Sequence, residues 1–111
     1  MGDASNGFQL VLTTTDSEAL AERLAHELVE RGLAACVNVV GPVQSVYRWD
    51  GEVIRSEERL LLAKTRVDRF QQVASLIREL HTYDVPEVLA ISLADGEPHY
   101  LGWLAESLRE R

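Results

Sequence analysis

The sequence has 111 residues, a formal net charge of −7 at pH 7 and one cysteine. This length fits one domain with its own core, and no apolar run approaches the ~20 residues of a membrane-spanning helix. Because no basic face offsets the negative charge, we expect neither nucleic acid nor an anionic membrane as a partner. A single cysteine excludes an intramolecular disulfide framework and a CxxC zinc site.

The N-terminal part predicts a leader, a strand and a helix. Residues 1–7 lack the charged and apolar regions of a secretory signal, so we expect a disordered leader on a cytoplasmic protein, followed by a single domain over residues 8–111. A strand is predicted over Phe8–Thr15, and Asp16 or Ser17 then caps a helix that ends at Gly32. Its apolar positions form one stripe: Leu20, Ala21, Leu24, Ala25 and Leu28.

The most distinctive stretch, residues 34–65, predicts a long β-hairpin. Asp50-Gly51 separates two runs rich in β-formers, and both residues tolerate the positive φ of a two-residue type I′ turn. Such a turn places Trp49 opposite Glu52. Gly41-Pro42 interrupts the first arm, where proline cannot donate to a neighbouring strand, so we predict a β-bulge there.

The length of this hairpin predicts an assembly. Residues 52–65 would extend ~46 Å at ~3.3 Å per residue, whereas a compact domain of this size is roughly 34 Å across. The tip therefore overhangs its own core. Since an isolated two-stranded ribbon is marginal in water, we expect another copy of the chain to cover Tyr47, Trp49, Val53 and Ile54.

The second half repeats the β-α-β order and adds a helix. Residues 65–68 resemble a capping box for a helix that runs to about Leu80, residues 86–94 predict a strand, and Pro98 suits the first turn of a last helix. This order predicts an α+β, ferredoxin-like sandwich with an extra C-terminal helix and with both long helices on one face. Residues 60–63 and 88–91 are apolar at consecutive positions. Both faces of the sheet are therefore expected to be buried, one of them against another subunit.

Cys36 and His81 are the candidate metal ligands. Cys36 lies within a strand and is either a small core residue or a soft ligand for copper. One cysteine cannot fill a metal site, so further ligands would come from elsewhere in the chain or from other subunits. His81 follows a helix beside Tyr83 and Glu87, where a protonated histidine could also act as a helix cap.

Other polar and aromatic residues suggest binding rather than catalysis. Lys64 ends an apolar run and needs a carboxylate partner, for which Glu58 and Glu87 are candidates. Tyr47 and Trp49 fit a subunit interface better than a base-stacking surface. The sequence has no GxSxG, P-loop, GxGxxG or HExxH motif and no convincing Cys-His pair, so we expect a protein without enzymatic activity.

A series of motifs gives the chain a family resemblance over about residues 10–108. The motifs are Leu33-Ala34-Ala35-Cys36-Val37-Asn38, Ser45-Val46-Tyr47-Arg48-Trp49-x-Gly51, Glu58-x-x-Leu61-x-x-Lys64-Thr65, His81-x-Tyr83-x-x-Pro86-Glu87 and Tyr100-Leu101-x-Trp103. In this order they resemble the CutA family, the divalent-cation tolerance proteins. The resemblance implies a homotrimer whose long hairpins pair with strands of neighbouring subunits, and a link to tolerance of copper and other divalent cations.

The resemblance also assigns individual residues. Cys36 matches the family's proposed copper ligand, and positions near the subunit clefts are matched by Trp49, Glu58, Lys64, His81, Tyr83 and Glu87. It implies copper or another divalent cation as ligand and no organic cofactor. Thr82 stands where many relatives have proline, and the additional cysteines of some relatives are missing.

Two other functions are compatible with the sequence. A trimeric small-molecule sensor like the PII signalling proteins shares the architecture. A phosphate-bearing effector would then need a basic cleft, for which Lys64, Arg48 and Arg66 are a thin supply. A purely structural role in a larger complex is the third candidate.

Overall fold

A computed structural model describes residues 7–108, and the predicted leader falls outside them except for Gly7. The elements are β1 (Phe8–Thr15), α1 (Glu18–Glu30), β2 (Cys36–Trp49), β3 (Glu52–Arg66), the short 3₁₀ turn η1 (Val67–Arg69), α2 (Phe70–Leu80), β4 (Leu89–Ser92) and α3 (Pro98–Ser107). This order confirms the predicted β-α-β, β-α-β, α arrangement. None of the helices in the described part of the chain is long and apolar enough to cross a membrane.

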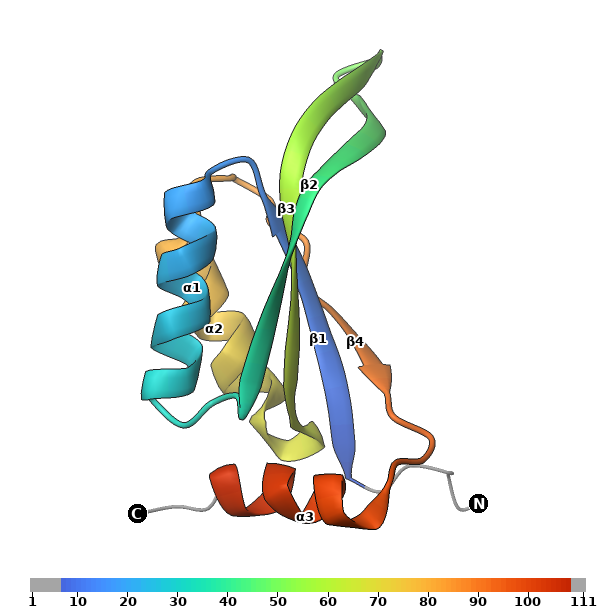
Figure 1. The fold of residues 1–111 in the computed structure, drawn as a ribbon. Coiled ribbons are helices and arrows are strands. Elements are labelled where there is room, and N and C mark those ends of the chain that lie inside the picture. Colours follow the sequence, from blue (N-terminus) through green and yellow to red (C-terminus); the bar gives the residue numbers. More distant parts are fainter. Residues whose placement is uncertain (1–6, 109–111) are drawn as a thin grey trace.

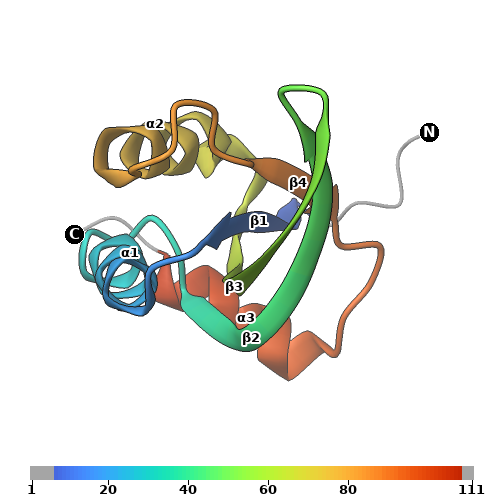
Figure 2. The same ribbon diagram turned by 90° about the horizontal axis from the view of Figure 1, so that it is seen from above.

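The strands form one antiparallel sheet in the order β2-β3-β1-β4, as a ferredoxin-like fold requires. Figures 1 and 2 show α1 and α2 side by side on one face of this sheet, which confirms the predicted placement of the two long helices. The last helix, α3, crosses one end of the sheet, where Leu104 and Leu108 pack against Phe8. The predicted α+β sandwich with an additional C-terminal helix is therefore correct.

The main core lies between the sheet and the helix pair. Alternate residues of β1 and β3 point toward the helices, so the fully buried Val11 and Leu61 pack against the apolar stripes of α1 and α2. Ser17 caps α1 by accepting a hydrogen bond from the backbone N–H of Leu20 at 3.1 Å. Gly32 follows the helix with φ 71°, the left-handed conformation that favours glycine.

The capping box predicted for α2 is wrong. Thr65 is completely buried within β3, and its hydroxyl donates to the carbonyl of Leu33 at 2.6 Å instead of capping a helix. The strand continues to Arg66, η1 follows, and α2 begins at Phe70 without a side-chain cap. Strand pairing of Thr65 with Gln9 thus outweighed the local capping pattern.

The hairpin has the predicted turn and register. Asp50 and Gly51 have φ values of 53° and 80°, as a type I′ turn requires, and Trp49 lies opposite Glu52. The predicted bulge is also confirmed, because Gly41 and Pro42 both fall opposite Arg59. The molecule is 44 Å long, and Figure 1 shows the hairpin extending beyond the ends of α1 and α2.

The second face of the sheet is apolar but open in the single chain. It is formed by residues that alternate with the core positions: Leu10, Leu12, Leu60, Leu62, Leu89 and Ile91. Leu89 and Ile91 are 58% and 52% exposed. These two residues belong to β4, which is shorter than the predicted strand over residues 86–94 because it pairs with β1 only from Gln9 to Leu12.

Candidate functional site

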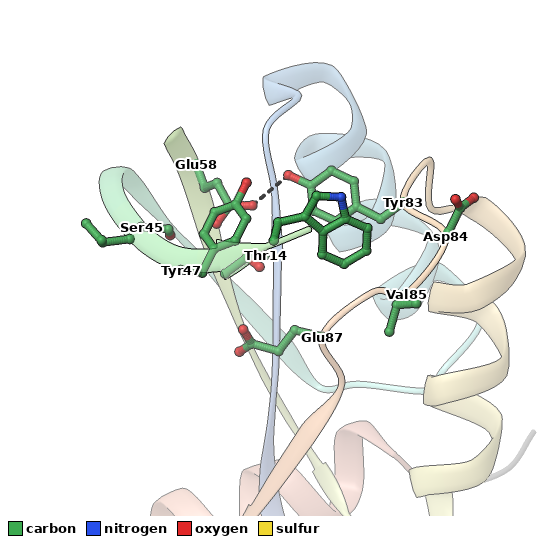
Figure 3. A pocket seen from close by; sticks show the side chains of 10 residues that line it. Thr14, Ser45, Tyr47, Glu58, Tyr83, Asp84, Val85 and Glu87 are labelled. Carbon is green, nitrogen blue, oxygen red and sulfur yellow. Dashed lines mark hydrogen bonds between the residues drawn. The ribbon is translucent and has the colours of Figure 1, made fainter. Parts of the chain in front are cut away.

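A cleft of about 610 Å³ lies between the outer part of the hairpin and the connector that joins α2 to β4 (residues 81–88); we call it the hairpin cleft (Figure 3). Its lining residues are Thr14, Ser45, Val46, Tyr47, Trp49, Glu58, Tyr83, Asp84, Val85 and Glu87. Strand pairing fixes the positions of the residues on the hairpin side of the cleft, because Tyr47 lies on β2 and Glu58 on the paired strand β3. The connector supplies the other side. The lining contains carboxylates and aromatic rings but no lysine, arginine or histidine.

Glu58 is the buried charge of the cleft, with 5% of its surface exposed. The hydroxyl of Tyr83 donates a hydrogen bond to its Oε2 atom at 2.6 Å (Figure 3). Burial, followed by this contact with the carboxylate, raises the pKa of Tyr83 well above its ordinary value. Within residues 7–108, no basic side chain forms an ion pair with Glu58. The cleft therefore contains a buried carboxylate that lacks a positive partner.

His81 does not line the cleft but forms hydrogen bonds with two residues that do, Thr14 and Tyr83. Its Nε2 atom lies 2.7 Å from the carbonyl oxygen of Thr14, and its Nδ1 atom accepts the backbone N–H of Tyr83 at 3.1 Å. A carbonyl can only accept and a backbone N–H can only donate, so these contacts fit the tautomer in which Nε2 donates to Thr14 and Nδ1 accepts from Tyr83. His81 is the C-cap residue of α2, as considered from the sequence, but its ring bonds Thr14 and Tyr83 instead of the last helix carbonyls. With both nitrogens engaged, His81 could bind a metal only by giving up one of these bonds.

Lys64 lies outside the hairpin cleft, and its predicted partners were wrong. Its Nζ atom donates to the hydroxyl of Tyr100 at 3.1 Å and lies 5.4 Å from the centre of that ring. This hydrogen bond raises the pKa of Lys64. Glu58 is six residues away on the same strand, about 20 Å at ~3.3 Å per residue. Tyr100 was missed as a partner because only the folded chain brings α3 against β3.

Cys36 is also distant from the cleft. It is partly buried and lies opposite Lys64, whereas the Thr14 carbonyl that binds His81 lies level with Leu60. Four residues of β3 separate these levels, about 13 Å along the strand. One chain therefore does not bring Cys36 and His81 together. Across residues 7–108, no three His, Cys, Asp or Glu side chains are grouped so that they could hold a metal ion.

The structure thus gathers five of the predicted residues, Tyr47, Trp49, Glu58, Tyr83 and Glu87, around one cleft. The other lining residues were not predicted: Thr14, Ser45, Val46, Asp84 and Val85. Thr14 and Ser45 belong to strands whose polar residues look solvent-exposed in the sequence. Their place in the cleft depends on the bulge and on the path of the connector, which no local pattern specifies.

The fold and the cleft define a small ferredoxin-like α+β protein with an acidic, aromatic cleft beside a long hairpin. The family model described as CutA1 divalent ion tolerance protein matches residues 9–107, and the chain belongs to this family.

Relatives and solved structures agree with this assignment. The chain is 46% identical over 99 residues to the divalent-cation tolerance protein CutA of Thermus thermophilus, covering 89% of this chain and 96% of the relative. It is 39% identical over 100 residues to the chloroplastic protein CutA of Arabidopsis thaliana, covering 90% of this chain but only 55% of that longer relative. The crystal structure of CutA1 from Oryza sativa superimposes with a TM-score of 0.91 at 37% identity, covering 98% of this chain and all of that one.

Proposed function

We propose that this protein acts in divalent-cation tolerance as a cytoplasmic, non-enzymatic homotrimer that binds copper or another divalent cation weakly. The observation that carries this proposal is the lining of the hairpin cleft, where Glu58, Asp84 and Glu87 are not balanced by any basic lining residue. Such a surface attracts cations and repels anions. The names of the relatives, which refer to divalent-cation tolerance, support the same role.

Weak binding follows from the arrangement of the donors. The Cys36 thiolate is the soft donor that suits copper, and the carboxylates of the cleft are hard donors that suit other divalent ions. Within residues 7–108 these donors do not converge on one point. A site with Cys36 and His81 would therefore be shared between subunits and would need His81 to release Thr14 or Tyr83. In the cytoplasm the cysteine would stay reduced and available.

The trimer is supported by two surfaces of the chain. The open face of the sheet exposes Leu89 and Ile91, and the hairpin exposes Trp49 and Val53 by 55% and 65%. Apolar side chains at this density are typical of protein interfaces. Packing of these faces between copies would also explain why β3 and β4 are apolar on both sides.

A small-molecule sensor remains the second candidate, because the volume of the cleft lies within the range of ligand pockets. A phosphate-bearing effector suits it poorly. Of the basic residues considered for that role, Lys64 contacts Tyr100, Arg48 donates to the Gly51 carbonyl, and Arg66 pairs with Asp68. Lys64 and Arg66 lie two residues apart on β3, and Arg48 lies beside the hairpin turn. None of the three lines the cleft.

Calorimetric titration of the whole protein with Cu(II), Cu(I) and adenine nucleotides tests these alternatives. We expect saturable binding of copper and no heat from the nucleotides. Nucleotide binding without copper binding would favour the sensor, and the absence of both would favour a structural role. Metal content and stoichiometry of the purified protein, with and without Cys36, would show whether the ion is held per chain or per trimer.

A further inference from the structure

The hairpin cleft combines two kinds of groups that suit a cation larger than a metal ion. Its aromatic residues are Tyr47, Trp49 and Tyr83, and its carboxylates are Glu58, Asp84 and Glu87. Aromatic faces bind weakly hydrated organic cations through cation–π attraction, whereas a small divalent ion needs several converging oxygen atoms. That convergence is not found among the described residues. Besides attracting divalent cations, the lining therefore has the aromatic groups that an organic cation needs.

Glu58 gives an independent argument for a positively charged ligand. A carboxylate that is 5% exposed is costly to bury unless it is paired, and here the neutral hydroxyl of Tyr83 donates a hydrogen bond to it. Its side chain lines the cleft, opposite residues of the connector (Figure 3). A cation in the cleft would supply the missing partner. The hydroxyl of Tyr83 already holds the carboxylate in place for this contact.

We propose that the hairpin cleft binds a small organic ammonium ion, with its positive group at Glu58 and its alkyl part against the aromatic residues. The volume of about 610 Å³ has room for such a molecule. The absence of basic lining residues removes the competing choice of an anionic effector. This site is separate from Cys36, so it goes beyond the proposed uptake of copper.

The test uses choline and its neutral carbon isostere, 3,3-dimethyl-1-butanol. Trp49 and Trp103 are the tryptophans of this chain, so Trp103→Phe leaves Trp49 as the fluorescent reporter at the cleft. We expect choline to change the Trp49 emission saturably, and the neutral isostere to bind about tenfold more weakly or less. Sodium chloride at matched ionic strength corrects for charge screening. Equal binding of the two probes, or binding of neither, would overturn the proposal.

Variants then connect the binding to Glu58. Glu58→Gln keeps the shape of the side chain but removes its charge, and we expect choline affinity to fall about tenfold. Glu22→Gln, an exposed substitution on α1, is the matched control and should leave affinity unchanged. Because Glu58→Gln could disturb folding, Glu87→Gln at the exposed rim provides a second test and should weaken binding in a folded protein. Unchanged affinity in both cleft variants would overturn the proposal.

The experiment also separates this proposal from copper binding and from assembly. It is performed on chelator-treated full-length protein, so choline binding does not depend on a metal. If a basic side chain of a neighbouring subunit filled the cleft, choline would not bind the assembled protein, and the proposal would fail while copper uptake could still be observed. If copper binding failed instead, the response of Trp49 to choline would be unaffected.

Discussion

The hydroxyl of Tyr83 lies 2.6 Å from Oε2 of Glu58 and joins the connector to the second arm of the hairpin. Glu58 lies next to Arg59, the residue opposite the Gly41-Pro42 bulge, on the side of the hairpin tip. At this point the hairpin leaves the body of the sheet. His81 holds the other end of this arrangement, because it binds both Thr14 of β1 and the backbone of Tyr83. The shape of the cleft therefore depends on a short chain of polar contacts from β1 through the connector to β3.

Removing the Tyr83 hydroxyl should destabilise the protein. Tyr83→Phe leaves the buried carboxylate of Glu58 without its donor, at an expected cost of about 1–3 kcal/mol. The matched control is Tyr47→Phe, since that hydroxyl makes an exposed 3.3 Å contact with Ser56 and should matter by about 0.5 kcal/mol or less. Urea unfolding measures both changes. Equal losses in the two variants would contradict a special role for the Tyr83–Glu58 contact.

The same contact predicts a loss of stability in alkali. The pKa of Tyr83 is raised in the folded protein, whereas in the unfolded chain it lies near its ordinary value of ~10. Its contribution to stability is therefore fully present below pH ~10 and is lost as the pH rises toward the folded-state pKa. Tyrosinate absorbance should show that one of the three tyrosines resists ionisation until the protein unfolds. In Tyr83→Phe this late step should disappear, and simultaneous titration of all the tyrosines in the native protein would disprove the prediction.

Local patterns predicted the features that local chemistry determines. Asp50-Gly51 defined the turn because both residues tolerate a positive φ, and Gly41-Pro42 defined the bulge because proline cannot donate to the neighbouring strand. The partners of Lys64 and His81 could not be predicted in this way. Lys64 meets Tyr100, and His81 meets Thr14, only after distant segments pack together. Thr65 was predicted to cap a helix, but its hydroxyl donates a hydrogen bond to the carbonyl of Leu33.

Arg69 is a candidate anchor that the sequence did not identify. Its guanidinium donates at 2.5 Å to both the Gly32 and Leu108 carbonyls, joining the end of α1 and the end of α3 to the start of α2. Arg69→Lys keeps the charge but cannot bridge two acceptors in this way, so we expect a loss of about 1–3 kcal/mol in unfolding free energy. Arg78→Lys, on the exposed face of α2, is the control and should have little effect. A negligible change in Arg69→Lys would show that the bridge contributes little.

Assembly should depend on the hairpin tip. Light scattering at low micromolar concentration should give about three times the chain mass, and a clean monomer would reject the proposed trimer. Trp49→Ala removes an exposed aromatic side chain at the tip, where truncation of an interface hot spot can cost ~2 kcal/mol or more. We expect the Trp49→Ala trimer to dissociate at a higher protein concentration than the unmodified trimer, while the helical signal of the subunit is retained. The control is Val29→Ala, an exposed apolar truncation on α1, which should leave the mass unchanged. An unchanged mass in Trp49→Ala as well would show that the tip is not at an interface.

Substitution of Cys36 tests whether the thiol binds copper. The side chain is only partly buried, so Cys36→Ser and Cys36→Ala should lower the unfolding free energy by about 1 kcal/mol or less, as thermal melting would show. Copper binds the thiolate, so we expect the apparent affinity of the unmodified protein to rise with pH. Both variants should lose most of this affinity in a copper titration. His99→Ala is the control for adventitious binding, because that imidazole side chain is 97% exposed and lies on α3. Full copper affinity in both cysteine variants would exclude Cys36 from the site, and loss of affinity in His99→Ala alone would identify surface binding instead.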